Sequence, residues 1–451
     1  MEFEYTPDQV VAKDTIKDFV LKSKVEDEDY FITLSGFAGT GKTTITNDII
    51  QEIKFKKKIV VSAPTHTAKE VIASVTKTNA ETIQALLGLR PDLDLTDFNP
   101  NKPQFAVKAD ERISKYDVLI IDESSMLGKS VVKLIKEKAI LNKVTVIFMG
   151  DKYQLPPIGE VISSVFTMPN QVELTTIVRQ SGTNPNLKLI ELARNDVRDK
   201  TDNCIPYLRS IVSALDKGEG FKLADRETYY TRLLDSYFDS EYQQNANLTK
   251  TICYTNKAVN STNDYIRKRL IHSDEIVAVG DILMGYKTVS RDIKNFPFFE
   301  SIVKNSVSYM VTGVEILERK VGGVILKGYK VLTKEGEYPM FVLHPDSYID
   351  FTNEYADRLQ TAMRYKRWKP FYDFKNEIQC MEDLNIYGGN KCSKDLGYGY
   401  AITVHKSQGS TYQHVAVTLK DILTNYDAQE RRKLIYVALS RTSKTNLIYL
   451  D

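Results

Sequence analysis

The sequence predicts an α/β fold in which a parallel sheet carries helices on both of its faces. Short apolar runs, typical of strands buried on both sides, occur at Phe31–Leu34, Ile59–Ala63, Val118–Ile121 and Val144–Met149. Segments with the apolar spacing of helices accompany them at Val10–Leu21, Thr43–Ile53, Thr67–Val75 and Val131–Ile140. Strands that alternate with helices favour a parallel sheet, because each crossover helix packs against a face of that sheet.

A second α/β pattern begins at Thr251–Leu270 and returns at Gly399–Leu450. The segment between them, Ile282–Leu396, is rich in Val, Tyr and Gly and is typical of short strands. These shifts predict a first domain over 1–89 and 108–178, with a small insertion at 90–107. They also predict a second domain over 179–281 and 397–451, interrupted by a β-rich insertion at 282–396 with a helical extension at about 350–383. Within that extension, we interpret Tyr365–Lys369 as a solvated helix face, with guidance of a strand as the alternative.

Composition limits the class of protein without deciding the partner. The 451 residues include 61 basic and 59 acidic side chains, a net charge of +2 that neither demands nor excludes nucleic acid. Four cysteines without a CxxC pair argue against a disulfide framework or a zinc site and favour a reducing compartment. We expect neither a signal peptide nor a membrane span, because the N-terminus is polar and no run of 18 apolar residues occurs. The expected location is the cytoplasm, or a host cytoplasm.

The segment Gly36–Thr43 (GFAGTGKT) matches the phosphate-binding pattern G-x-x-x-x-G-K-[ST] between a predicted strand and a predicted helix. Its glycines allow backbone N–H groups to turn toward phosphate oxygens, and the following helix presents its positive end to the same anion. Lys42 would reach the β- and γ-phosphates, and the Thr43 hydroxyl would bind Mg²⁺. The sequence therefore predicts a site for ATP, formed by Gly36, Phe37, Ala38, Gly39, Thr40, Gly41, Lys42, Thr43 and Thr44.

Acidic and basic residues could complete this site. Asp122 and Glu123 follow an apolar strand, where one carboxylate can hold Mg²⁺ and the other can deprotonate the attacking water. An isolated acidic pair could also cap a helix, but its combination with the phosphate loop favours Asp122 as metal ligand and Glu123 as general base. Arg179 and Arg441 are candidates to neutralise transition-state charge, although each taken alone could be an ordinary surface arginine.

The motifs that accompany these residues resemble, in the same order, those of superfamily 1 helicases, and most closely those of the RecD-like branch, superfamily 1B. The resemblance covers nearly the whole chain. It rests on Thr6–Gln9, Gly36–Thr43 (motif I), Ala63–Lys69 (Ia), Asp122–Met126 (II), Gly150–Pro157 (III), Arg179 (IV), Thr403–Ser410 (V) and Tyr436–Thr442 (VI).

This resemblance implies two RecA-like P-loop NTPase domains with ATP and Mg²⁺ in the cleft between them. Gln9 would read the adenine edge, Gln154 would sense the γ-phosphate, and Arg179 and Arg441 would approach from the second domain. Segment 90–107 would carry a pin that separates strands, and segment 282–396 resembles the SH3-like insertion of this branch. Both insertions match by position, with little residue identity.

The same resemblance implies contacts to single-stranded DNA on both domains. Histidine often follows Thr-Ile in the family, whereas Gln84 follows Thr82-Ile83 here. Phe98 could stack on a base or anchor a turn. An isolated His66 or His405 would be interpreted as a buried imidazole, but the motif context favours strand binding. The implied DNA contacts are Pro64, Thr65, His66, Thr82, Phe98, Thr255, Asn256, His405, Lys406 and Ser407.

We therefore expect an ATP-dependent DNA helicase that moves 5′→3′ along single-stranded DNA; the direction follows from the resemblance alone. Expected partners are single-stranded DNA, duplex forks, and a single-stranded-DNA-binding protein or replisome components; the family suggests a monomer. The sequence leaves three alternatives open: an RNA or ribonucleoprotein-remodelling motor, a strand-binding module with little turnover, and a small-molecule kinase. The kinase accounts only for the phosphate loop and not for motifs III, V and VI.

Overall fold

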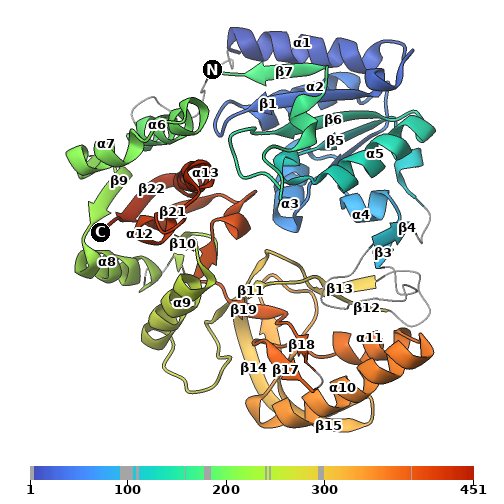
Figure 1. The fold of residues 1–451 in the computed structure, drawn as a ribbon, viewed down its shortest axis with the longest axis vertical. Coiled ribbons are helices and arrows are strands. Elements are labelled where there is room, and N and C mark those ends of the chain that lie inside the picture. Colours follow the sequence, from blue (N-terminus) through green and yellow to red (C-terminus); the bar gives the residue numbers. More distant parts are fainter. Residues whose placement is uncertain are drawn as a thin grey trace.

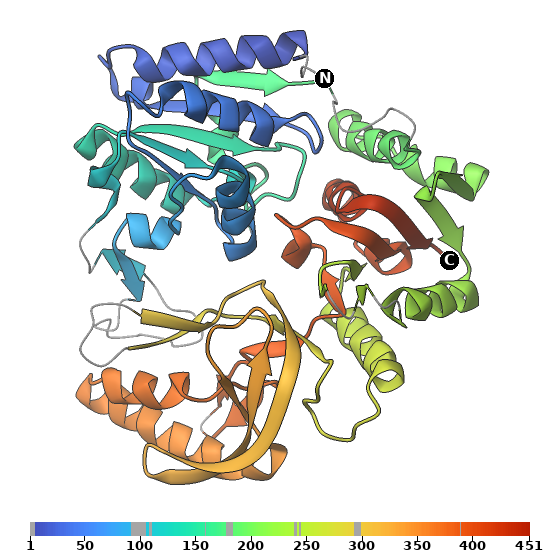
Figure 2. The same ribbon diagram turned by 180° about the vertical axis from the view of Figure 1, so that it is seen from behind.

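The computed structural model describes residues 5–91, 105–107, 111–157, 159–176, 184–238, 241–242, 245–292, 299–387 and 389–451. Two of the residues predicted as functional, Phe98 and Arg179, lie outside these ranges. The described chain forms two α/β units beside each other and a β-rich insertion that lies below both in Figure 1 and, from behind, in Figure 2.

The first sheet is fully parallel, with the strand order β2-β5-β6-β1-β7. Its strands are β1 (Phe31–Gly36), β2 (Ile59–Ser62), β5 (Val118–Ile121), β6 (Thr145–Gly150) and β7 (Gln171–Leu174). Its helices are α1 (Pro7–Leu21), α2 (Lys42–Ile53), α3 (His66–Thr76), α4 (Ile83–Leu86) and α5 (Lys129–Asn142). The four strands and four helices predicted for this part of the chain are confirmed.

Strand residues alternate between the two faces of this sheet, as the pleat requires. Ile32 and Leu34 pack with apolar side chains of α1, α2 and α3 in one core. Phe31 packs with side chains of α4 and α5 in a second core on the opposite face. All six residues of β1 are buried, which explains why the strand appears in the sequence as an apolar run without alternation.

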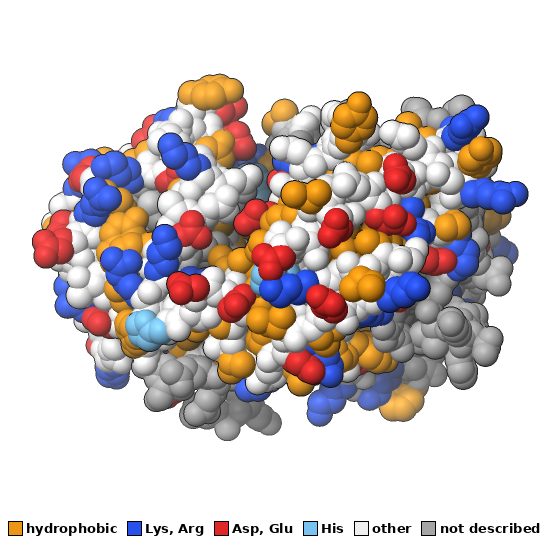
Figure 3. Space-filling model, turned by 90° about the horizontal axis from the view of Figure 1, so that it is seen from below, with side chains coloured by type: hydrophobic (Ala, Val, Ile, Leu, Met, Phe, Trp, Pro, Cys, Tyr) orange, Lys and Arg blue, Asp and Glu red, His pale blue; other side chains and the backbone are white. Residues whose placement is uncertain are grey.

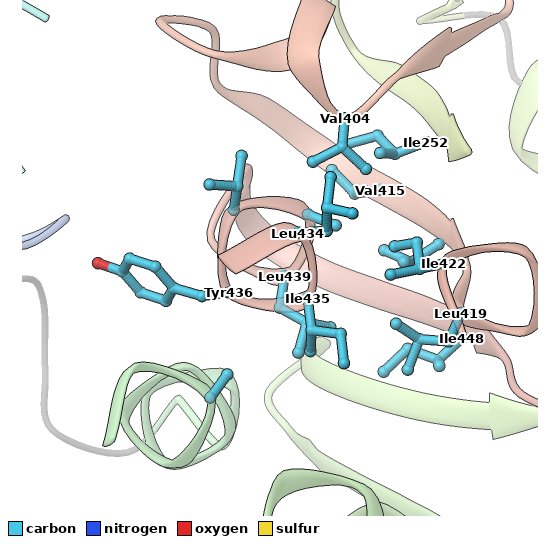
Figure 4. Packing of buried hydrophobic residues seen from close by; sticks show 14 of the residues in the cluster. Ile252, Val404, Val415, Leu419, Ile422, Leu434, Ile435, Tyr436, Leu439 and Ile448 are labelled. Atoms are coloured by element: carbon cyan, nitrogen blue, oxygen red, sulfur yellow. The ribbon is translucent and has the colours of Figure 1, made fainter. Parts of the chain in front are cut away.

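The second sheet has the order β20-β10-β21-β22-β9-β8 and is parallel except at its β8 edge. Its strands are β8 (Ser213–Asp216), β9 (Glu219–Ala224), β10 (Thr249–Cys253), β20 (Ala401–Thr403), β21 (Tyr412–Thr418) and β22 (Thr442–Tyr449). The helices are α6 (Asn186–Asp199), α7 (Cys204–Ile211), α8 (Arg226–Phe238), α9 (Asn256–Leu270), α12 (Leu419–Ile422) and α13 (Ala428–Leu439). Side chains from α6, α7, α12 and α13 fill one core, part of which Figure 4 shows. The predicted fold class, two α/β domains with parallel sheets flanked by helices, is confirmed.

The β-rich insertion is built on an antiparallel sheet with the order β16-β15-β14-β11-β19. Its strands are β11 (Ile282–Gly285), β14 (Ser308–Val321), β15 (Val324–Thr333), β16 (Met340–Leu343) and β19 (Leu396–Tyr398). The β14–β15 hairpin turns at Gly322 and Gly323, whose φ angles of 60° and 109° favour glycine. Smaller antiparallel pairs are β3 (Leu89–Pro91) with β4 (Phe105–Val107), β12 (Val289–Asp292) with β13 (Phe299–Val303), and β17 (Leu384–Ile386) with β18 (Asn390–Cys392). The likeness of this insertion to an SH3-like domain stays a prediction.

The interpretation of Tyr365–Lys369 as one solvated helix face is wrong. Helix α10 (Tyr348–Tyr365) is followed by Lys366, whose left-handed φ of 54° ends the helix. The next helix, α11 (Lys369–Asn376), begins three residues after Lys366. Between the helices, the Trp368 side chain is only 3% exposed and packs edge-on against Phe371, with ring centroids 5.9 Å apart. The buried Trp368 therefore interrupts the exposed basic segment. The spacing of apolar residues in a helix does not predict this interruption.

None of the helices within the described ranges is long and apolar enough to cross a membrane.

Lys250, in β10, an interior strand of the second sheet, is fully buried and joins that sheet to the insertion. Its Nζ donates to the Gly399 carbonyl at 2.5 Å and lies 3.4 Å from the Ser308 hydroxyl. Burial lowers the pKa of Lys250 to about 7, whereas an unfolded lysine has a pKa of about 10.4. Between these values the unfolded chain holds more protons, so this group adds stability as pH rises and imposes its full penalty below about pH 7.

We therefore expect Lys250→Met to raise the free energy of unfolding more at about pH 6 than at about pH 9. Chemical denaturation of both proteins at each pH measures the difference. Lys257→Met, at an exposed position on α9, is the matched control and should change stability equally at both pH values. An equal effect of Lys250→Met at both pH values would show that Lys250 keeps an ordinary pKa.

Candidate nucleotide site and nucleic-acid interface

The phosphate loop connects β1 to α2 and holds its lysine inside the curve of the loop. Gly39 and Gly41 have left-handed φ angles of 87° and 80°, which glycine adopts without strain. The Lys42 ammonium donates to the carbonyls of Gly36 at 2.7 Å and Phe37 at 3.0 Å. Helix α2 begins at Lys42. Its first backbone N–H groups and the positive end of its dipole therefore favour a phosphate at the same position as the ammonium does.

Gln9, in the first turn of α1, is fully buried against this loop. Its Nε2 donates to the Thr40 carbonyl at 3.0 Å, and its Oε1 accepts from the Thr6 backbone N–H at 3.0 Å. A Cβ at Gly41 would lie 2.6 Å from the Gln9 Nε2, so this contact and the positive φ both require glycine there. Gln9 thus supports the loop; its contact with adenine stays a prediction.

The acidic pair stands at the end of β5, facing the loop. Glu123 has a left-handed φ of 51°, an uncommon conformation that is associated with functional sites. Its Oε2 is buried and has no hydrogen-bond partner among the described residues. Burial and the neighbouring Asp122 charge raise the pKa of Glu123, whereas the charges of Arg441 and Lys42 oppose that rise. A buried carboxylate with an unpartnered oxygen and a raised pKa suits a general base.

The residues around Lys42 fit a magnesium ion shared with a nucleotide. Burial raises the pKa of Asp122, but Lys42 is close enough to lower it through its charge. The Asp122 carboxylate and the Thr43 hydroxyl are oxygen ligands of the kind that Mg²⁺ prefers. The described ranges hold no cluster of three or more His, Cys, Asp or Glu that could bind a metal by itself. Remaining ligands would therefore come from phosphates and water, as is usual for Mg²⁺.

Polar contacts join the two α/β domains across the cleft. The Tyr436 hydroxyl on α13 donates to Asp151 Oδ2 in motif III at 2.6 Å. Figure 4 shows this ring on the far side of α13 from Ile422 and Ile448. Gln408 of motif V donates to the Leu155 carbonyl at 3.2 Å, which adds a second link to the motif III segment. The two α/β domains therefore contact each other through motifs III, V and VI.

Arg441 comes to this cleft from the second domain. Its side chain is 4% exposed, and its guanidinium donates to the Val437 carbonyl and the Ser440 hydroxyl, each at 3.1 Å. Its charge acts directly on Glu123, so Lys42, Asp122, Glu123 and Arg441 meet in one site. Gln154 lies on the motif III segment, 5% exposed, with a buried Oε1 that lacks a partner within the described chain. The catalytic roles given to these residues stay predictions.

Arg194 on α6 is a residue at this site that sequence reasoning missed. Its guanidinium carbon lies 4.0 Å from the ring centroid of Phe37 in the phosphate loop. The Phe37 ring lies 6.0 Å from that of Tyr153 in motif III. Arg194 is 8% exposed, and its Nη1 is buried without a hydrogen-bond partner in the described structure. No sequence signal could have found it, because it lies inside an ordinary amphipathic helix.

We expect Arg194→Ala to raise the KM for ATP with a smaller change in kcat, because it loosens the second domain from the phosphate loop. A partly desolvated cation–π contact of about 1–2 kcal/mol corresponds to roughly a five- to thirtyfold effect. Steady-state ATPase kinetics measure it. Arg198→Ala is the control, since Arg198 lies on the same helix but pairs with Asp199 at the surface. An unchanged KM in Arg194→Ala would remove Arg194 from the site.

Three threonines predicted to contact DNA are N-caps of helices. The hydroxyls of Thr65, Thr82 and Thr255 accept from the backbone N–H groups of Ala68, Ala85 and Ala258 at 3.2, 3.2 and 3.1 Å. Caps of this kind fix the start of a helix, where free N–H groups favour anions. The three threonines therefore define the positive ends of α3, α4 and α9. Their contacts with single-stranded DNA stay predictions.

The remaining residues predicted to contact DNA differ in their exposure to solvent. Asn256 and His405 are exposed, and Pro64 is half-buried. Burial lowers the pKa of His66 to about 4, so its imidazole is neutral at neutral pH. The Ser407 hydroxyl is fully buried and donates to the Val404 carbonyl at 2.7 Å, so in this conformation it holds the motif V turn.

Gly409 in motif V lies where motif Ia, which is predicted to bind DNA, comes close to the acidic pair. A Cβ at this residue would lie 3.1 Å from Ala68, 3.3 Å from the Thr65 hydroxyl and 3.6 Å from the Glu123 side chain. Its φ of 75° also favours glycine. Motif Ia, motif II and motif V thus lie close together at one point between the domains.

Comparison with known proteins agrees with this geometry. Residues 19–205 match the AAA domain family, and residues 398–449 match the UvrD-like helicase C-terminal domain family. The chain is 25% identical to the ATP-dependent DNA helicase dda of Enterobacteria phage T4, over 94% of this chain and 95% of that protein. It is 26% identical to the uncharacterized protein R530 of Acanthamoeba polyphaga mimivirus, over 91% of this chain and 93% of that protein.

A solved structure of the Pif1 helicase from Candida albicans shares the fold, with a TM-score of 0.51 and 18% identity, over 100% of this chain and 94% of that one. Fold and site together define a two-domain P-loop motor enzyme that hydrolyses ATP. The chain belongs to the superfamily 1B helicases, the group of Pif1 and RecD, and is related to Dda.

Proposed function

We propose that this protein is an ATP-dependent DNA helicase that moves 5′→3′ along single-stranded DNA and unwinds duplex ahead of it. The observation that carries the proposal is the meeting of motifs Ia, II and V around Gly409, which links the nucleotide site to the strand motifs. Full-length relatives named as DNA helicases support DNA as the substrate. Bacteroides Pif1 bound to single-stranded DNA, with a TM-score of 0.52 and 16% identity, has the same fold.

In the proposed hydrolysis, Lys42 holds the β- and γ-phosphates, and Thr43 and Asp122 would hold a magnesium ion, which would supply positive charge against the phosphates. Glu123 takes a proton from the water that attacks the γ-phosphorus, and the bond from that phosphorus to the leaving oxygen of ADP breaks. Arg441, together with the predicted Arg179, stabilises the negative charge that spreads over the transferred group. Gln154 orients the same group from motif III.

Movement along the strand would follow from opening and closing of the cleft. Because Thr65 and Glu123 both lie beside Gly409, with room for little more than a methyl group between them, a change at the phosphates would shift motif V against motif Ia. Motif Ia grips the strand with the first domain, and motif V grips it with the second. Closure would therefore shift one grip by about one nucleotide relative to the other, and the segment 90–107 would split the duplex.

Unwinding of duplexes that carry a single 5′ or 3′ tail, with DNA or RNA as the tracking strand, tests the proposal. We expect unwinding only from the 5′ DNA tail. Activity from the 3′ tail alone would overturn the direction. Preference for an RNA tracking strand, which a protein can sense through the 2′-hydroxyl, would instead establish an RNA motor. Strand binding without ATP turnover would establish a binding module.

We also propose that the protein acts as a monomer in a reducing compartment. The acidic pair, the lysine and Arg441 all come from one chain, so a second copy is not needed to complete the site. The four cysteines are buried as free thiols. Light scattering during chromatography, with and without a DNA oligonucleotide, tests the monomer, and a mass of two chains in the active fraction would contradict it.

A further inference from the structure

A tyrosine where the insertion joins the second domain is flanked by two lysines. Tyr286 follows β11, Lys394 precedes β19, and Lys406 belongs to motif V. The Lys394 and Lys406 ammonium groups lie 4.1 Å and 4.4 Å from the centroid of the Tyr286 ring. Strands β11 and β19 lie side by side (Figures 1 and 2), so residues over a hundred positions apart form one cluster.

The backbone fixes this ring in place. A Cβ at Gly397 would lie 2.9 Å from the Tyr286 ring and 3.5 Å from the Lys394 ammonium, so the bare backbone packs against both. The Tyr286 backbone N–H donates to the Asp395 carbonyl at 2.8 Å. The ring is therefore a rigid support that sets the positions of the two ammonium groups.

Nearby carboxylates offset the charge of this cluster only in part: the charges of Asp383 and Glu382 act on Lys394, but burial still lowers the pKa of that lysine. Lys406 donates to two neutral oxygens, the Gly285 carbonyl and the Asn305 side chain, each at 3.1 Å. Neither Lys394 nor Lys406 takes part in an ion pair recorded for the described residues. Burial, and then the positive charge of Lys394, lower the pKa of Lys406 to about 8. Holding two partly buried cations together costs free energy that a bound anion would offset.

The cluster also adjoins the predicted path of the strand. Asn305, which accepts from Lys406, is followed by Ser306, whose carbonyl accepts from the Thr67 hydroxyl of motif Ia at 3.1 Å. Motif Ia and motif V are thus connected through this loop of the insertion. Acidic and basic side chains are interspersed over the insertion's end of the molecule (Figure 3), so attraction for an anion there is local.

We propose that Lys394 and Lys406, positioned by Tyr286, bind the phosphodiester backbone of the single strand where it passes from motif V to the insertion. This inference rests on the proposed function and extends it from Lys406 of motif V to Lys394 and Tyr286, which lie outside the helicase motifs. Lys394 contacts the strand through its charge, and Tyr286 is a positioning residue. The site recognises phosphates and is therefore independent of base sequence.

The salt dependence of oligo-dT binding, measured by fluorescence anisotropy, tests this site. Each phosphate contact on a single strand adds about 0.7 to the slope of log affinity against log salt. We expect Lys394→Gln to reduce the slope by about 0.7, Lys394→Arg to keep it, and Tyr286→Ala to reduce it in part. Lys330→Gln is the control, because Lys330 is exposed on β15 and pairs with Glu315 at 3.2 Å, and neither residue is among those whose charge acts on Lys394 or Lys406. ATPase activity without DNA should stay unchanged in all four variants.

An unchanged slope in Lys394→Gln, with normal binding by the unsubstituted protein, would overturn this inference alone. Absence of oligo-dT binding by the unsubstituted protein would overturn the proposed function and this inference together. If Lys394→Gln does not fold, the comparison of Tyr286→Ala with Tyr286→Phe decides: equal slopes would overturn the site. A lower slope in Tyr286→Ala alone would support it.

Discussion

Lys42→Ala is expected to lower kcat for ATP hydrolysis by about 10²–10³-fold or more, the cost of removing one preorganised positive group from a transition state. The Lys42 ammonium is held inside the phosphate loop by the Gly36 and Phe37 carbonyls. It is therefore preorganised to stabilise charge on the transferred phosphoryl group. Lys42 itself is not among the residues predicted to contact DNA, so affinity for single-stranded DNA should stay within a few-fold.

Steady-state ATPase assays with and without oligo-dT, together with anisotropy of labelled oligo-dT, measure the two properties of Lys42→Ala separately. Lys54→Ala is the matched control, because Lys54 stands exposed at the other end of α2. It should leave both properties unchanged. An equal loss of hydrolysis and strand binding in Lys42→Ala would mean that the substitution damages the fold, and it would contradict the specific role.

Arg441→Ala is expected to lower kcat by about 10³-fold or more, the usual scale for an arginine that neutralises a transferred phosphoryl group. ATP should still bind, since the phosphate loop is untouched. Arg441 also lowers the pKa of Glu123 against the rise caused by burial. Without Arg441 that pKa should rise further. Glu123 must be deprotonated to act as a base, so the acidic limb of the kcat–pH profile should move to higher pH.

Kinetics across a pH series, with nucleotide binding measured by a fluorescent ATP analogue, check both effects. Arg441→Lys keeps the charge and should move the acidic limb less than Arg441→Ala does. Arg432→Ala serves as control, because Arg432 lies on α13, the helix that ends just before Arg441, and pairs with Asp202 at 2.9 Å. An acidic limb that stays in place in Arg441→Ala would show that the charge of Arg441 does not act on Glu123.

Local sequence pattern predicted the elements of the first domain well, and it failed where one residue changed the backbone. The apolar runs around Ile32 and Ile120 became buried strands, because burial on both faces leaves no room for polar alternation. Tyr365–Lys369 was misinterpreted because Lys366 takes a left-handed conformation and Trp368 turns into the core. Neither feature has a signature in the spacing of apolar residues.

By itself, the sequence determined the parts of this protein that are continuous in the chain. The phosphate loop with Lys42 and the acidic pair are short segments whose backbone geometry sets their chemistry. Only the tertiary structure decided which distant residues meet them, such as Arg194 over Phe37. The Tyr286–Lys394–Lys406 cluster depends equally on how the chain returns on itself. Such contacts form between elements brought together by packing, and no local period or spacing records that proximity.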